Sequence, residues 1–360
     1  MADSAGGYSS TVDIGHLEPP ALVIHGGAGT FEWLRRLGEG ASGRMRSALE
    51  ESLSEGWGVL DGGGSALAAV VEAVASMENS GMFDAGRGSV PTTAGTIEMD
   101  AAVMEGDGHR AGAVCATTWP ANPVRAALLV ARLGLPSGGE AGAAGDGPRP
   151  AGSAGSAGSA GSAGSAGSAG QAGTAATDRR FGGAQGRGGD GGFWPLLLAG
   201  NGADEFARAA GLERMSHTTQ APRPPGAPGH GTVGAVAVDV EGHVAAATST
   251  GGVSGQPPGR VGDSPIIGAG TWADDSTAAV SGTGSGESFI LAGFGHRVDW
   301  MLRQGSSLGQ ALVASLEAVA LLGGTGGGIV LRRSGEFAAA FDTGAMARAW
   351  CHRGEVVVRL

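Results

Sequence analysis

A threonine at the start of a predicted strand has the surroundings of a nucleophile. Gly231 and Thr232 open the segment Gly-Thr-Val-Gly-Ala-Val, shortly after a Pro-rich stretch. A hydroxyl is a poor nucleophile until a base removes its proton. The chain has no lysine and no histidine at an obvious triad spacing, so one base remains: the α-amino group of Thr232, released if its bond to Gly231 is cut. The ordinary pKa of such an amine, about 7.7–8.0, suits proton transfer at neutral pH. By itself, however, Gly-Thr most often marks a plain strand start.

Further Gly-flanked segments carry side chains that suit an amino-acid substrate. Arg260 and Asp263 lie three residues apart within residues 259–265, where the guanidinium can bind a carboxylate and the aspartate an ammonium group. A surface salt bridge is the plainer explanation of this pair. Residues 281–287 offer a hydroxyl and backbone N–H groups before a helix, which suits stabilisation of an oxyanion, although a Gly-rich turn would look the same. Residues 248–250 add hydroxyls at a strand end.

Apolar runs and helical spacings predict the elements that must position these residues. Strands are expected over residues 21–24, 97–104, 111–117, 232–240, 243–248 and 278–282, with a terminal hairpin over 326–333 and 337–341. Helices are expected over residues 44–60, 65–77, 122–132, 203–210, 288–303 and 308–322, with a compact loop over 78–89. This order favours an α+β fold with two helix layers around two stacked sheets.

Composition narrows the classes of function. The net charge is −11 and no basic run is present, which argues against nucleic-acid binding. The absence of lysine excludes a lysine Schiff base and a Gly-Lys-Ser/Thr phosphate loop. Cys115 and Cys351 match no metal-ligand spacing and are expected to be buried thiols. With no secretion signal and no apolar run of about 18 residues, we expect a soluble, cytoplasmic protein that does not enter a membrane.

A low-complexity stretch interrupts the chain over residues 137–192. Within it, the triplet Ser-Ala-Gly repeats six times over residues 153–170. Such a composition is typical of a flexible linker. We therefore expect a flexible tail over residues 1–20, a first part over 21–231 that contains the linker, and a second part of the same domain over 232–360.

Together these motifs resemble the plant-type asparaginase / isoaspartyl aminopeptidase family of N-terminal-nucleophile (Ntn) hydrolases. The matching strings are His-Gly-Gly-Ala-Gly at 25–29, Gly-Thr-Val-Gly-Ala-Val at 231–236, Ala-Thr-Ser-Thr-Gly-Gly at 247–252, Gly-Arg-Val-Gly-Asp-Ser-Pro at 259–265 and Ser-Gly-Thr-Gly-Ser-Gly-Glu at 281–287. Weaker likeness covers residues 84–88, 111–125, 202–214 and 323–350. The resemblance spans nearly the whole chain except the tail and the linker.

The resemblance implies a four-layer αββα sandwich and a precursor that is cut between Gly231 and Thr232. It also implies a role for each matching residue: Thr232 as the nucleophile, Thr250 as its hydrogen-bonding support, Arg260 as the carboxylate clamp, Asp263 as the ammonium partner, Thr283 and Gly284 as the oxyanion hole, and Thr283 and Gly286 as substrate contacts. The expected reaction releases L-aspartate from L-asparagine or from a β-aspartyl dipeptide.

The family further implies a structural sodium ion, although the chemistry itself needs no cofactor. The ion would bind main-chain carbonyls of Met77, Glu78, Ser80, Phe83, Ala85 and Arg87, since hard cations prefer oxygen ligands. A dimer of cleaved α–β heterodimers is also implied.

The chain departs from the family pattern at three places, and rival functions stay open. Asp84 stands where the family usually has asparagine, the linker is unusually long and repetitive, and residues 341–346 differ slightly from the family's late segment. A glycosylasparaginase shares the fold and the Arg-Val-Gly-Asp-Ser-Pro string. An uncleaved, inactive scaffold is a second alternative, motivated by Asp84 and the linker. A disordered protein, suggested by 72 glycines, conflicts with the apolar segments on both sides of the linker.

Overall fold

Two β-sheets and two groups of helices make up the protein. The computed structural model describes residues 8–29, 40–133, 195–216 and 231–360. The larger sheet has the order β13-β12-β2-β6-β7-β3-β4-β5 and the smaller sheet the order β1-β11-β10-β9-β8. The expected α+β fold is confirmed. The predicted linker over residues 137–192 and the Pro-rich stretch over 221–228 lie outside the described residues.

The bounds of the elements are as follows. The larger sheet consists of β2 (Ala21–Gly29), β3 (Met99–Glu105), β4 (Ala111–Thr117), β5 (Leu197–Ala199), β6 (Val233–Val238), β7 (Val244–Thr250), β12 (Ala345–His352) and β13 (Glu355–Arg359). The smaller sheet consists of β1 (Thr11–His16), β8 (Thr271–Ala273), β9 (Ala279–Gly284), β10 (Gly326–Leu331) and β11 (Glu336–Phe341). The helices are α2 (Ala41–Asp61), α3 (Ala66–Ser80), α4 (Pro123–Arg132), α6 (Gly200–Ala209), α7 (Gly286–Ala292), α8 (Phe294–Arg303), α9 (Leu308–Leu321) and the 3₁₀ turn η1 (Gly86–Gly88).

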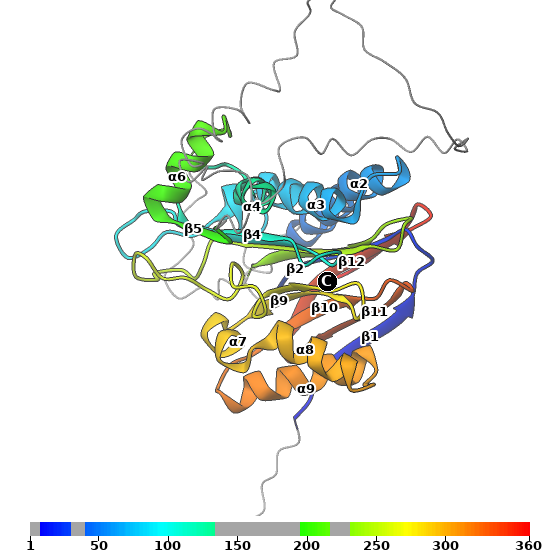
Figure 1. Ribbon diagram of the computed structural model, residues 1–360. Coiled ribbons are helices and arrows are strands. Elements are labelled where there is room, and N and C mark those ends of the chain that lie inside the picture. Colours follow the sequence, from blue (N-terminus) through cyan, green and yellow to red (C-terminus); the bar gives the residue numbers. More distant parts are fainter. Residues whose placement is uncertain (1–7, 30–39, 134–194, 217–230) are drawn as a thin grey trace, which may run out of the picture.

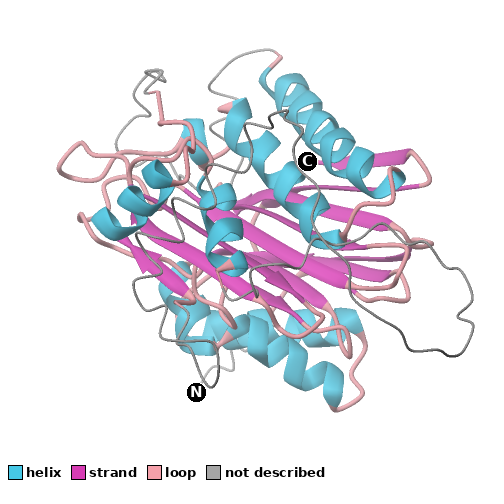
Figure 2. Ribbon diagram, turned by 45° about the horizontal axis from the view of Figure 1, so that its top comes forward, coloured by secondary structure: helices cyan, strands magenta, loops and turns pink. Residues whose placement is uncertain are grey.

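The helices cover the outer faces of the two sheets. Figure 1 shows α2, α3 and α4 against the larger sheet and α7, α8 and α9 against the smaller one, with the sheets facing each other between them. In the turned view of Figure 2 the strands again occupy the middle and the helices lie on both sides. No helix among the described residues combines the length and apolar character needed to cross a membrane.

Strand β6 shows why the central strands are apolar on both faces. Alternate side chains of a strand point to opposite faces of its sheet. In β6, Val233 and Ala235 belong to the cluster of buried side chains beneath α2–α4, whereas Val236 and Val238 belong to the cluster between the sheets. Small side chains let the layers approach closely. The Gly231–Thr232 junction directly precedes this buried strand. Strand β6 itself pairs antiparallel with β2.

Three sequence predictions need correction. The tail predicted as flexible contains β1, an edge strand that pairs antiparallel with β11. The sequence did not indicate this strand, because an edge strand is held by backbone pairing and can lack an apolar pattern. The helix predicted over residues 288–303 is two helices, divided at Gly293, whose φ of 57° lies in the left-handed region that ends helices. The predicted loop over 78–89 starts later, because α3 continues to Ser80.

Candidate active site

One pocket brings together most of the residues that the sequence singles out. It lies where the ends of β6, β7 and β9 meet the loop before β8, and it is lined by Gly231, Thr232, Thr250, Gly252, Val253, Arg260, Asp263, Thr283 and Gly284. These residues come from four segments that are far apart in the sequence. Their convergence makes this pocket the candidate active site.

Thr232 lies at the pocket wall, beside the hydroxyl of Thr250. The Thr232 Oγ1 donates to the Thr250 Oγ1 at 3.2 Å, and that same oxygen accepts the backbone N–H of Gly252 at 3.1 Å. Both threonines are largely buried. The pairing of β6 with β7 holds the two hydroxyls in this geometry, since Val233 lies opposite Ser249. The arrangement orients the Thr232 hydroxyl through a neighbour that carries no charge.

Gly231 fits only because it has no side chain. A Cβ at this position would lie 2.6 Å from both the Cβ and the backbone N of Asp84. Asp84 is itself buried, and it binds the neighbouring backbone through two oxygens: its Oδ1 accepts the N–H of Val90 at 3.0 Å, and its carbonyl accepts the N–H of Gly251 at 2.7 Å. The loop that carries Asp84 therefore packs directly against the predicted cleavage point.

His25 is a buried neighbour of Thr232 that sequence spacing did not connect with it. Burial lowers the pKa of His25 to about 3, and a backbone hydrogen bond with Thr232 opposes this shift only weakly. The His25 Nε2 lies 2.9 Å from the Ser281 Oγ, which lies 2.8 Å from the Thr248 Oγ1. His25 is thus neutral at physiological pH and part of a polar network inside the core.

Arg260 and Asp263 face the same side of the pocket. Arg260 binds Glu287 in a bidentate manner, with Nε 2.9 Å from Oε1 and Nη2 3.0 Å from Oε2. A Cβ on Gly286 would lie 2.8 Å from the Arg260 Nη2 and 3.0 Å from the Asp263 Oδ1. Glycine at this position therefore keeps open the space next to both charged groups.

Asp263 is buried without a full set of partners. Asp263 is only 3% exposed, and its Oδ2 has no hydrogen-bond partner among the described residues. Burial raises the pKa of Asp263 to about 7, against the influence of Arg260, and the negative charges of Asp100 and Glu287 raise it further. A buried, unpartnered carboxylate oxygen is costly, so this group is suited to a cationic ligand.

Thr283 and Gly284 end β9 at the edge of the pocket. The Thr283 Oγ1 accepts the backbone N–H of Ala28 at 3.4 Å, which links it to the Gly-rich end of β2. Gly284 has a φ of 150°, a conformation that side chains rarely adopt, and a Cβ there would collide with backbone of residues 325 and 326. The predicted oxyanion-hole residues are thus held in the pocket by backbone contacts.

Glu78 plays a part that its sequence position did not reveal. It lies in α3, is fully buried, and burial raises its pKa to about 7. Its carboxylate accepts the Ser249 hydroxyl at 2.6 Å and the Asn122 amide at 3.0 Å. Because Ser249 precedes Thr250, the carboxylate of Glu78 fixes β7 from the side opposite the pocket.

The chain is similar in sequence to known proteins. A sequence model of the family described as Asparaginase matches residues 18–132 and 214–358. An isoaspartyl peptidase/L-asparaginase of Xenopus laevis is 34% identical over 92% of this chain and 91% of the relative. An isoaspartyl peptidase of Escherichia coli is 33% identical over 93% of each chain, and a plant-type L-asparaginase of Pyrobaculum calidifontis is 35% identical over 94% of this chain and 99% of the relative.

Proposed function

The chain belongs to the asparaginase family, and from this premise we propose that it hydrolyses the side-chain amide of L-asparagine and the β-aspartyl bond of isoaspartyl dipeptides, releasing L-aspartate. We propose further that the protein cuts itself between Gly231 and Thr232 to become active, within a four-layer αββα sandwich of the Ntn-hydrolase type. The observation that carries the proposal is the buried carboxylate of Asp263 beside Arg260, in the pocket that also holds Thr232. A free α-amino acid head group supplies the cation and the carboxylate that this pair requires.

The proposed reaction begins at the Thr232 hydroxyl. The freed α-amino group of Thr232 takes the hydroxyl proton while the oxygen attacks the side-chain carbonyl carbon. Thr283 and Gly284 stabilise the oxyanion, the proton passes to the leaving ammonia or amine, and an aspartyl ester remains on Thr232. Water then attacks the ester and releases L-aspartate. The maturation cut uses the same hydroxyl, but the α-amino group is not yet free. The Thr232 oxygen attacks the Gly231 carbonyl carbon, and the Gly231–Thr232 amide bond breaks in an N-to-O acyl shift that frees the amine and leaves Gly231 as an ester on Thr232. Water then hydrolyses this ester and separates the two fragments.

We include the sodium ion and the dimer in the proposal as structural features. A Cβ on Gly88 would collide with the carbonyl oxygen of Phe83 and lie 3.1 Å from that of Gly81, so two loop carbonyls point toward this place, as a hard cation needs. The Met77 carbonyl accepts the Ser80 hydroxyl at 2.7 Å and the Ala85 carbonyl accepts the N–H of Gly88 at 3.1 Å, and a carbonyl oxygen has two lone pairs. The ion would stiffen the loop next to Gly231, with Glu78, Ser80, Phe83 and Arg87 as the other carbonyl donors.

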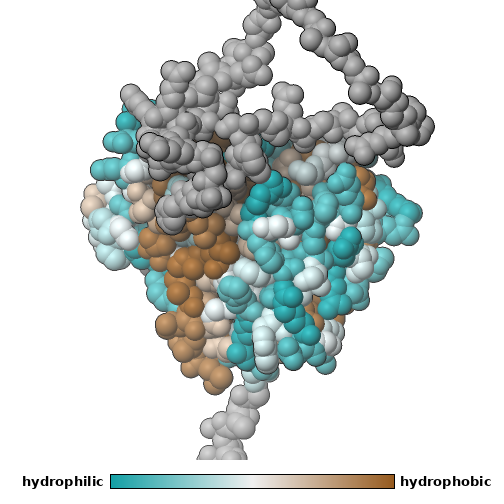
Figure 3. All heavy atoms as spheres, viewed as in Figure 1, coloured by the Kyte–Doolittle hydropathy of each residue, from teal (hydrophilic) through white to brown (hydrophobic). Residues whose placement is uncertain are grey.

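A dimer of cleaved heterodimers would bury apolar surface that is exposed in the single chain. Figure 3 shows an apolar strip over the region of α7 and the adjoining end of α9, where Leu291, Leu321 and Leu322 are exposed. Light scattering of the purified protein tests the dimer, and Leu321→Glu should shift it toward the monomer if this strip is the interface.

A cytoplasmic location is proposed as well, since both cysteines are free and buried.

The decisive experiment measures intact masses under denaturing conditions, after incubation at neutral pH, together with ammonia release from L-asparagine. Two fragments that meet at Gly231 and Thr232 are expected, and Thr232→Ala should give one full-length mass and no hydrolysis. Thr232→Ser, which keeps the hydroxyl, is the matched control and should keep part of both activities. Unchanged hydrolysis by Thr232→Ala would overturn the mechanism.

Two rival functions have their own outcomes in this experiment. A single stable full-length mass of the wild-type protein, without hydrolysis, would favour an uncleaved scaffold. Faster hydrolysis of a glycosylated asparagine than of L-asparagine or a β-aspartyl dipeptide would favour a glycosylasparaginase.

A further inference from the structure

The loop that carries Arg260 and Asp263 is held by two carboxylates of one strand segment. Asp100, in β3, accepts the backbone N–H of Gly262 through Oδ2 at 3.1 Å. Glu98, two residues earlier, accepts the backbone N–H of Gly259 through Oε2 at 2.6 Å. Arg260 lies between these two anchored glycines and Asp263 follows the second one. The backbone of the head-group site is thus fixed at two points.

A bulge between β3 and β4 gives Asp100 its position. The pairing register shifts between Met99 and Ala101, and Ala116 opposite has a φ of 47°, which is unusual for a residue with a side chain. The Asp100 Oδ1 accepts the N–H of Ala116 at 2.8 Å, so each oxygen of this buried side chain holds one backbone N–H. On the other side of β3, Asp100 lies opposite Thr250. One residue thereby touches the loop of Arg260 and pairs with the strand of Thr250.

Negatively charged side chains outnumber positively charged ones in the surroundings of Arg260. Arg260 interacts electrostatically with Glu287, Asp100 and Asp263, so three carboxylates surround one guanidinium. A zwitterionic head group brings one positive and one negative charge to this place. A substrate that keeps the carboxylate but lacks the ammonium group adds only negative charge, and like charges at short distance are unfavourable. A negative excess at this point therefore favours substrates with an α-amino group.

We propose that Asp100, assisted by Glu98, is a positioning residue that makes the site select substrates with a free α-amino group, because it holds Gly262 and adds negative charge next to Arg260. The inference rests on the proposed hydrolase function and assigns its substrate selectivity to a residue that does not line the pocket. Burial raises the pKa of Asp100 to about 6, against the hydrogen bonds from Ala116 and Gly262, so the carboxylate is ionised at pH 8, where the test is made.

The test compares Asp100→Asn with the wild-type protein on two substrates at pH 8. L-asparagine has the α-amino group, and succinamate is the same molecule without it. For L-asparagine we expect KM to rise about tenfold, since a buried charge-assisted hydrogen bond and a nearby charge are lost, and kcat to stay within about threefold. The preference for L-asparagine over succinamate should fall about tenfold, and self-cleavage should go to completion as in the wild type.

Two further variants keep the test decisive. Glu98→Gln alters the exposed half of the two-point attachment and should change KM in the same direction by about two- to threefold, even if Asp100→Asn folds poorly. Glu105→Gln changes a carboxylate at the far end of β3, which pairs with Arg110, and should leave both substrates unaffected.

Each outcome has one meaning. An unchanged preference for L-asparagine over succinamate in both Asp100→Asn and Glu98→Gln, or an equal loss on both substrates, would overturn the role of Asp100 while the hydrolase function stands. A wild-type protein that neither cleaves itself nor releases ammonia would overturn the proposed function itself.

Discussion

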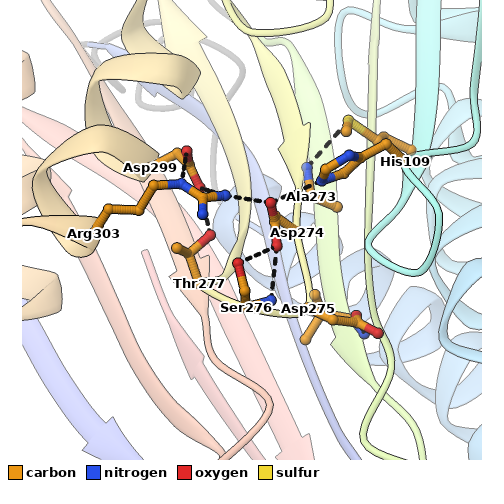
Figure 4. A network of polar contacts seen from close by, with 10 residues as sticks. His109, Ala273, Asp274, Asp275, Ser276, Thr277, Asp299 and Arg303 are labelled. Carbon is orange, nitrogen blue, oxygen red and sulfur yellow. Dashed lines mark hydrogen bonds and ion pairs between the residues drawn. The ribbon is translucent and has the colours of Figure 1, made fainter.

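Two buried aspartates lie before and after strand β8, and their surroundings differ. Asp263, in the candidate active site, is 3% exposed and has an oxygen without a hydrogen-bond partner among the described residues. Asp274, directly after β8, is 5% exposed and accepts from the Ser276 N–H at 2.7 Å, the Ser276 hydroxyl at 2.6 Å and His109 Nε2 at 2.7 Å. Figure 4 shows these contacts together with the ion pair between Asp274 and Arg303.

The two environments move the pKa in opposite directions. Burial raises the pKa of Asp263 to about 7. Burial would also raise the pKa of Asp274, but the hydrogen bonds from Ser276 and His109 and the charge of Arg303 outweigh it and lower the pKa to about 2. Asp274 is thus a structural carboxylate whose donors are supplied by the protein, and Asp263 is a binding carboxylate with a place left for a donor of the ligand.

The largest expected effect separates the two aspartates by activity. Asp263→Asn should lower kcat/KM for L-asparagine by about a hundredfold or more, because the substrate ammonium loses a buried charged partner. The matched variant Asp274→Asn should stay within about threefold of the wild type. Steady-state kinetics on both, after intact-mass confirmation of self-cleavage, checks this. Equal losses in the two variants would contradict the distinction.

The pH dependence of kcat/KM should follow Asp263 and not Asp274. Substrate binding needs ionised Asp263, which is lost as the pH falls through about 7, and the proposed base needs a deprotonated Thr232 amine, which is lost as the pH falls through about 8. The wild-type profile of log kcat/KM should therefore approach a slope of two on the acid side. Asp263→Asn should approach a slope of one, because one of the two titrating groups is gone, while Asp274→Asn keeps the wild-type slope. A slope of one in the wild type would show that only one group controls this limb.

Sequence reasoning reached the pocket because its residues lie in short strings. The strings at 231–232, 248–250, 259–265 and 281–287 each hold their chemistry within a few positions, and their resemblance to one family indicated a common site. The supporting residues have no such signal. Asp100 and Gly262 are 162 positions apart and Glu78 and Ser249 are 171 apart, and only the tertiary fold brings each pair together.

The secondary structure, too, was predicted from the sequence only in part. Buried strands such as β6 and β7 consist of small and β-branched residues and were predicted, whereas β12 and β13 combine arginine, histidine and glutamate with apolar residues and were not. The edge strand β1 was missed because its stability comes from backbone pairing with β11 and not from its own pattern. The break at Gly293 depends on one backbone conformation inside a continuous apolar pattern.

Stability should change in opposite directions in the two asparagine variants. A raised carboxyl pKa means that folding stability is lost as the pH rises from the unfolded value near 4 through 7, so Asp263→Asn should be stabilised at pH 8, by about 4 kcal/mol. A lowered pKa means that stability is present above about 4 and is lost as the pH falls through 2, so Asp274→Asn should be destabilised at pH 8 by about 2 kcal/mol.

Chemical denaturation at pH 8 and pH 4 checks these signs. The difference between each variant and the wild type should shrink at pH 4 for Asp263→Asn and stay large there for Asp274→Asn. A destabilised Asp263→Asn at pH 8 would mean that the Asp263 carboxylate is a structural group after all.

The smallest effect is expected when His243, the partner of Asp275, is replaced. Asp275 directly follows Asp274. Its Oδ2 lies 2.6 Å from the His243 Nδ1, and its Oδ1 accepts the N–H of Val244 at 2.8 Å. The hydrogen bond with Asp275 raises the pKa of His243, whose side chain is 38% exposed.

Stability from a histidine with a raised pKa is fully present below its unfolded value near 6.5 and is lost as the pH rises through the folded value. Because water and salt screen an exposed pair, His243→Gln should cost at most about 1 kcal/mol at pH 5.5 and less at pH 8.5, with unchanged kcat/KM. Denaturation curves at both pH values, with and without added salt, measure this. A loss that depends on neither pH nor salt would mean that packing, and not charge, holds His243, and the comparison would then apply only to carboxylates as buried as Asp263 and Asp274.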